Sequence, residues 1–71
     1  MENMGLSSLE RKLISLLKSF NVDRFDIIGI MKVLEGKEQN QGELLHFLEG
    51  LENKPMEMDA MMYRVEEIVN R

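Results

Sequence analysis

The sequence predicts an all-α fold, a compact bundle of four short helices at approximately residues 8–20, 24–35, 41–52 and 56–70. Apolar residues recur at intervals of three and four along most of the chain, which is the spacing of a helix face, and strand-like alternation is nearly absent. Capping residues precede these segments, and short polar or glycine-containing stretches separate them. Short connections favour antiparallel or steeply crossed neighbours, so we expect a compact bundle.

The first helix begins at a capping box. Ser7 can accept a hydrogen bond from the first turn, and Glu10 can reach back to the backbone N–H of Ser7. Asn21 suits the turn that follows. One apolar face is expected from the residues at helical spacing, which are Leu9, Leu13, Leu16, Leu17 and Phe20.

The second helix has the clearest start signal in the chain. Asp23 occupies the cap position, and Asp26 complements the positive end of the helix dipole. Val22 and Ile27 have the spacing of a hydrophobic staple. The apolar residues that follow spread over more than half of the helix circumference, so we expect this helix to pack on two sides or to be central. They are Ile27, Ile28, Ile30, Met31, Val33 and Leu34.

The stretch GKEQNQG, residues 36–42, is polar and bounded by glycines, and it predicts a loop before the third helix. Gly36 follows the last apolar residue of the second helix and is expected to be a left-handed C-terminal cap. Asn40, three residues before Glu43, is the expected N-cap of the third helix. Its apolar face is formed by Leu44, Phe47, Leu48 and Leu51.

Pro55 disfavours helix at Lys54 and is a plausible first residue of the fourth helix. Methionines are concentrated at the start of this helix, where flexible thioether side chains suit either an adaptable binding groove or an irregular core. We favour the core for Met58, Met61 and Met62 because they continue a helical stripe. The stripe also contains Val65, Ile68 and Val69.

Length and composition bound the class of protein. A chain of 71 residues predicts a single domain, residues 1–71, with residues 1–6 expected to be frayed. The absence of cysteine excludes disulfides and thiolate metal sites. The start lacks the pattern of a secretory signal, and no apolar run approaches the length of a membrane span. We therefore expect a cytoplasmic protein that does not enter a membrane.

The net charge is −4 and is unevenly distributed. Residues 1–34 carry five Lys/Arg against four acids, whereas residues 35–71 carry four against nine. An acidic chain lacks the counterion release that dominates affinity for nucleic acids. A helix-turn-helix is disfavoured further, because a seven-residue loop exceeds the usual turn and the third helix would present glutamates to phosphate. We expect no nucleic-acid partner.

Glu43, His46 and Glu49 form a stripe on the third helix that resembles the Glu-x-x-His pairs of di-iron bundles. His46 points away from the apolar face at 100° per residue, and it is the only histidine of the chain. A solvated polar face is the better interpretation, so we expect no metal and no cofactor. The few serine hydroxyls have no catalytic partner in the sequence, and we expect no enzyme.

Several apolar residues point away from the main apolar faces, and such a surplus on a small chain suggests an interface. The candidate interface residues are Ile14, Phe25, Met56, Ala60 and Tyr63. The expected function is a small acidic protein–protein interaction or regulatory module that self-associates, with a homodimer formed through the second and fourth helices. The alternative is a structural subunit of a larger assembly, including a phage-encoded one.

Overall fold

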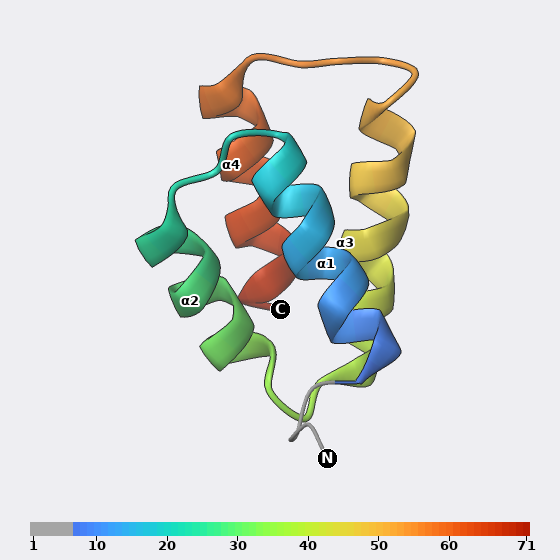
Figure 1. Cartoon of the computed structure of the whole chain (residues 1–71), viewed down its shortest axis with the longest axis vertical. Helices are drawn as coiled ribbons and strands as arrows, with labels where there is room; N and C mark the ends of the chain where they lie inside the picture. Colours follow the sequence, from blue (N-terminus) through green and yellow to red (C-terminus); the bar gives the residue numbers. More distant parts are fainter. Residues whose placement is uncertain (1–6) are drawn as a thin grey trace.

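The computed structural model describes residues 7–71 and contains four α-helices, which confirms the all-α fold (Figure 1). Those residues form no strand. The frayed start expected at residues 1–6 lies outside the described residues. The helices are α1 Ser8–Ser19, α2 Arg24–Leu34, α3 Glu38–Leu51 and α4 Met58–Val69.

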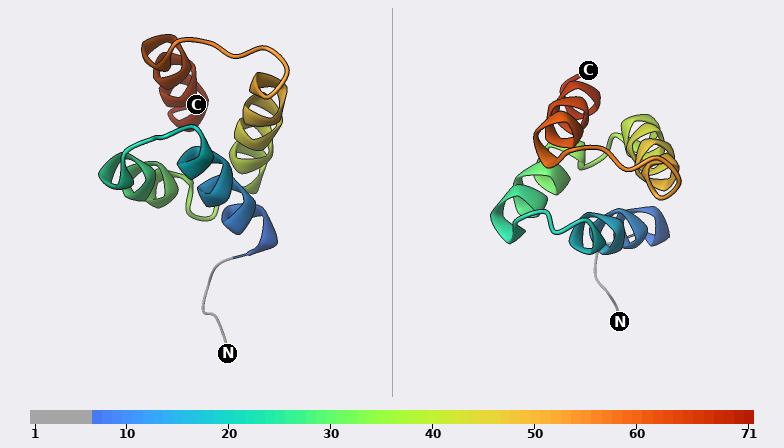
Figure 2. Two further views of the ribbon diagram at one scale, coloured as in Figure 1. Left: turned by 45° about the horizontal axis from the view of Figure 1, so that its top comes forward. Right: turned by 90° about the horizontal axis from the view of Figure 1, so that it is seen from above.

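The four helices surround one hydrophobic core (Figure 2). Helix α1 packs against α2 and α3, and α4 packs against the same two helices from the other side. Side chains from every helix are fully buried, as expected from the apolar faces. The largest of them are Leu13, Leu17, Leu34, Leu44, Leu48 and Val65.

The starts of α1 and α2 follow the predicted capping chemistry. The backbone N–H of Glu10 donates to Ser7 Oγ at 3.2 Å, and the N–H of Ser7 donates to Glu10 Oε1 at 2.9 Å. Asp23 accepts a hydrogen bond from the N–H of Phe25 at 3.0 Å. Asn21 turns the chain between the helices with a φ of 66°, a left-handed conformation that asparagine tolerates better than most residues. These local interactions therefore determine the turn between α1 and α2.

The loop predicted at residues 36–42 is wrong in its extent. Gly36 has the expected left-handed backbone, with a φ of 78°, but α3 begins directly afterwards at Glu38. The connection between α2 and α3 is therefore only Glu35–Lys37. Asn40 is not the N-cap; Lys37 holds that position and its side chain makes no capping hydrogen bond.

Long-range hydrogen bonds explain why the polar segment joins α3. The side-chain amide of Asn40 donates to the carbonyl of Ile68 in α4 at 3.2 Å. Gln41 is 2% exposed, and its amide donates to the carbonyl of Leu34 at 2.7 Å. Carbonyls in the last turn of a helix lack an i+4 partner within the helix, and these two amides bind such carbonyls at the ends of α4 and α2. The carbonyl of Leu34 also accepts from the backbone N–H of Lys37 at 2.8 Å.

The connection between α3 and α4 spans residues 52–57, and α4 begins at Met58, two residues later than the predicted start at residue 56. Met58 is 41% exposed, so its assignment to the core is wrong. The buried layer of α4 begins with Met61, one turn further on, and Met62 packs partly against it. The first turn of α4 extends beyond this layer, which leaves Met58 outside the core.

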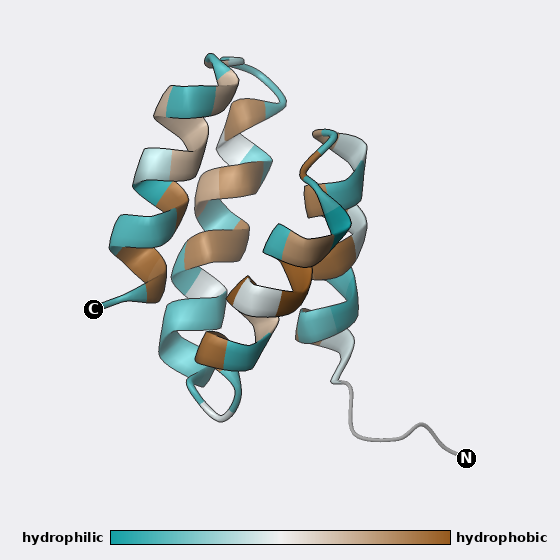
Figure 3. Cartoon of the chain, turned by 90° about the vertical axis from the view of Figure 1, so that its left-hand side faces the viewer, coloured by the Kyte–Doolittle hydropathy of each residue, from teal (hydrophilic) through white to brown (hydrophobic). Residues whose placement is uncertain are grey.

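Helix α2 leaves apolar side chains exposed on either side of its buried face. Ile27, Ile30 and Leu34 are buried, whereas Ile28 and Val33 are 50% and 42% exposed. Figure 3 views the molecule from the side of α2 and shows that hydrophobic residues make up much of this helix. Helix α2 packs against all three other helices, as expected of a helix with such a wide apolar surface, yet part of that surface stays exposed within this chain.

Candidate protein-binding groove

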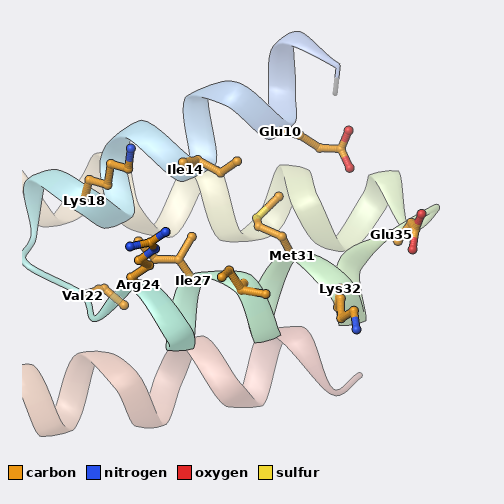
Figure 4. A pocket seen from close by; sticks show the side chains of 10 residues that line it. Glu10, Ile14, Lys18, Val22, Arg24, Ile27, Met31, Lys32 and Glu35 are labelled. Carbon is orange, nitrogen blue, oxygen red and sulfur yellow. The ribbon is translucent and has the colours of Figure 1, made fainter. Parts of the chain in front are cut away.

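An open groove of about 840 Å³ runs between α1 and α2 (Figure 4). Val22 and Ile27, both buried, form its floor, so the groove is continuous with the hydrophobic core. Ile14 and Met31 are half-buried, and both pack against the core while lining the groove. Ile28 stands on its α2 wall and is half exposed. The middle of the groove is thus apolar surface that the chain leaves accessible.

The two ends of the groove carry opposite charge. Lys18, near the end of α1, and Arg24, at the start of α2, lie together at one end (Figure 4). Glu10, in the first turn of α1, and Glu35, directly after α2, lie at the other end with Lys32. The groove therefore has a basic end, an apolar middle and an end at which carboxylates outnumber the cation.

Helical spacing places these side chains on the facing sides of α1 and α2. On α1, Glu10, Ile14 and Lys18 follow one another at intervals of four residues. Residues at this spacing lie on one helix face, so acidic, apolar and basic side chains succeed one another along it. Figure 4 shows α2 running in the opposite direction to α1 beside the groove, so its residues at helical spacing line the other wall in reversed charge order. They are Arg24, Ile28, Met31 and Glu35.

Of the five predicted interface residues, the structure brings only Ile14 into the groove. Phe25 is 79% exposed in the first turn of α2, next to the basic end. Tyr63 is 70% exposed and lies one turn from the exposed Ala60 on α4, and Met56 is exposed in the preceding connection. None of these four residues lines the groove. Their role in binding stays a prediction.

A second, shallower hollow lies between α3 and α4 and includes His46 on its rim. His46 is exposed, and residues 7–71 contain no cluster of three or more His, Cys, Asp or Glu side chains arranged to hold a metal. The two guanidiniums of this hollow are already paired: Arg71 with Glu43 at 2.7 Å, and Arg64 with Glu67 at 2.6 Å. Each guanidinium of this hollow therefore already has a carboxylate partner.

The short connection between α2 and α3 changes one argument about nucleic acids. The seven-residue loop used against a helix-turn-helix is absent, because Glu35–Lys37 is of ordinary length for such a turn. The acidic surface of α3 does not depend on the length of this connection. Helix α3 exposes Glu38, Glu43 and Glu49, which would repel phosphate.

The lining of the groove was missed at the level of sequence, apart from Ile14. The charge order along residues 10–18 and residues 24–35 is visible in the sequence as charged residues placed one turn beyond apolar ones. This charge order lines a groove only because α1 and α2 are neighbours. The residue pattern of a single helix does not predict which helices lie side by side. Within residues 7–71, no helix combines the length and apolar character required to cross a membrane.

No protein-family model, curated protein sequence or solved structure matches this chain. The binding properties of the groove are therefore inferred from the residues that line it.

Proposed function

We propose that this protein is an interaction module that acts by docking an apolar protein segment into the groove between α1 and α2. The observation that carries the proposal is the half-exposed Ile28, which continues the apolar lining that Ile14, Ile27 and Met31 provide in the groove. Concave apolar surface rimmed by charges is the usual form of a binding site for an amphipathic helix. The charged ends then set the direction in which the segment lies.

The proposal assigns binding rather than catalysis to the chain. The accessible groove is lined by aliphatic side chains, a thioether, lysines, an arginine and glutamates, and no hydroxyl or imidazole faces it. Such a lining supports recognition by burial and charge, and provides no nucleophile with an adjacent base. The cytoplasmic location and the absence of a nucleic-acid partner stay predictions within this proposal.

Site-specific photo-crosslinking in the native cell tests the proposal. A benzophenone amino acid at position 28 is expected to form an adduct with a defined protein, whereas the same probe at position 11, exposed on α1 outside the groove, is expected to form none. Excess unlabelled chain should compete for the adduct, and the Ile28→Glu chain should not. Equal labelling at both positions, or no protein adduct at position 28, would overturn the proposed function.

A further inference from the structure

The charges of the groove are arranged so that two grooves fit one another. We propose that the groove between α1 and α2 is the interface of an antiparallel homodimer, in which the basic end of one copy faces the acidic end of the other. This inference rests on the proposed function and names the occupant of the groove.

Symmetry selects between the two ways of pairing identical grooves face to face. A two-fold axis along the groove would place Lys18 and Arg24 against the same residues of the second copy. A two-fold axis across its middle places them opposite Glu10 and Glu35 of the second copy instead. Like-charge juxtaposition disfavours the first arrangement, and the second pairs unlike charges at both ends.

The apolar middle completes the self-complementary surface. Any occupant must present an acidic group to Lys18 and Arg24, an apolar centre, and a basic group to the opposite end. The α2 residues that line the groove of a second copy present this order when that copy lies antiparallel. Ile28 and Met31 of the two copies then meet near the two-fold axis. The chain therefore carries the segment that its own groove requires.

The balance of charge also favours a second copy at this face. The whole chain carries a net charge of −4, so most approaches of two copies are repulsive. The groove contains three cations, Lys18, Arg24 and Lys32, against two carboxylates, Glu10 and Glu35. The groove is thus a region of the acidic chain in which two copies meet without net negative repulsion. This pairing uses α1 and α2, not the second and fourth helices expected from the sequence.

Complementary charge reversal tests the inference. The first variant is Lys18→Glu with Arg24→Glu, which makes both ends acidic; all the altered side chains are exposed. The second is Glu35→Lys with Glu10→Gln, because glutamine at position 10 keeps the capping box with Ser7 while removing the charge. Circular dichroism should show both variants folded, since no core side chain changes.

Sedimentation equilibrium and native mass spectrometry provide the readout. We expect the unsubstituted chain to dimerise, and each variant on its own to dimerise with a dissociation constant raised by about tenfold or more. Mixing the two variants should restore a heterodimer that binds at least as tightly as the unsubstituted chain, because unlike charges then meet at both ends.

Several outcomes would overturn the inference. They are an unsubstituted chain that stays monomeric at high micromolar concentration, variants that dimerise as the unsubstituted chain does, and a mixture that fails to recover. The photo-crosslinking experiment separates this failure from failure of the proposed function, since an adduct with a different protein at position 28 contradicts only the homodimer.

Discussion

Helices α2 and α3 are of similar length but use their apolar residues differently. In α3 the leucines of the inner face, Leu44, Leu48 and Leu51, are at most 5% exposed, and the outer face is polar. In α2, Ile28 and Val33 are about half exposed although the same helix also contributes buried side chains to the core. The core of this chain therefore buries the inner leucines of α3, whereas part of the apolar surface of α2 stays exposed.

The difference separates residues that fold the chain from residues available for binding. Exposed apolar side chains contribute little to the stability of a monomer, because their burial in the folded state is incomplete. The half-exposed isoleucine of α2 also lies on the wall of a charged groove, whereas the apolar side chains of α3 that remain partly exposed pack against the core. We therefore expect substitutions in the two helices to affect different measurements.

The largest expected effect is on folding, and it belongs to α3. Leu48→Ala should lower the free energy of unfolding by about 2–5 kcal/mol, since a fully buried leucine leaves a cavity. In a domain of this size, that loss is comparable to the whole stability. The matched change in α2, Val33→Ala, should alter stability by about 0.5 kcal/mol or less. Urea denaturation followed by circular dichroism measures both unfolding free energies. Equal losses of stability would contradict the difference between α3 and α2.

A smaller effect is expected where α3 meets the end of α2. Gln41→Ala removes the buried amide that donates to the carbonyl of Leu34, and it should cost about 1–2 kcal/mol because one hydrogen bond is lost and a buried side chain leaves a cavity. The carbonyl of Leu34 keeps the backbone N–H of Lys37 as a partner at 2.8 Å. Gln39→Ala, on the exposed side of the same helix turn, is the control and should be nearly neutral. A neutral result for Gln41→Ala would show that this hydrogen bond does not fix the junction.

Two glycines of α2 and its C-terminal turn should respond with opposite sign. Gly36→Ala forces a side chain into a left-handed backbone and should destabilise the fold by about 1–2 kcal/mol. Gly29 lies inside the helix, and a methyl group added there meets no atom within 4 Å other than its chain neighbours and the nearby backbone of the helix itself. Gly29→Ala should therefore stabilise the fold by roughly 0.5–1 kcal/mol. Thermal unfolding distinguishes these outcomes, and a Gly29→Ala variant that loses stability would show a close approach at this position.

The sequence predicted the elements whose signals are local. The capping box of Ser7 and Glu10, the cap at Asp23 and the left-handed Gly36 each depend on residues a few positions apart. The start of α3 was misplaced because Asn40 and Gln41 resemble loop residues until their partners are known. Asn40 reaches a carbonyl that lies 28 positions away in the chain, and Gln41 takes a core position one turn before Leu44.

The groove illustrates the same limit for the candidate site. The charge order of each wall is present in the sequence, and the wide apolar face of α2 was recognised from periodicity. That α1 and α2 lie side by side in opposite directions is a tertiary fact, and only this places Lys18 beside Arg24 and Glu10 beside Glu35. The single predicted residue found in the groove, Ile14, was identified because it departs from the main apolar face of α1.

The most direct test of the central claim measures folding and association in the same variant. Ile28→Glu suits it, because glutamate favours helix and stands four residues from both Arg24 and Lys32, so α2 should remain intact. Val33→Glu on another face of α2 is the matched control. We predict that Ile28→Glu leaves the unfolding free energy of the dilute monomer within about 0.5 kcal/mol but abolishes the dimer in sedimentation, and that Val33→Glu leaves the dimer intact. An Ile28→Glu chain that unfolds, or that dimerises like the unsubstituted chain, would contradict the account.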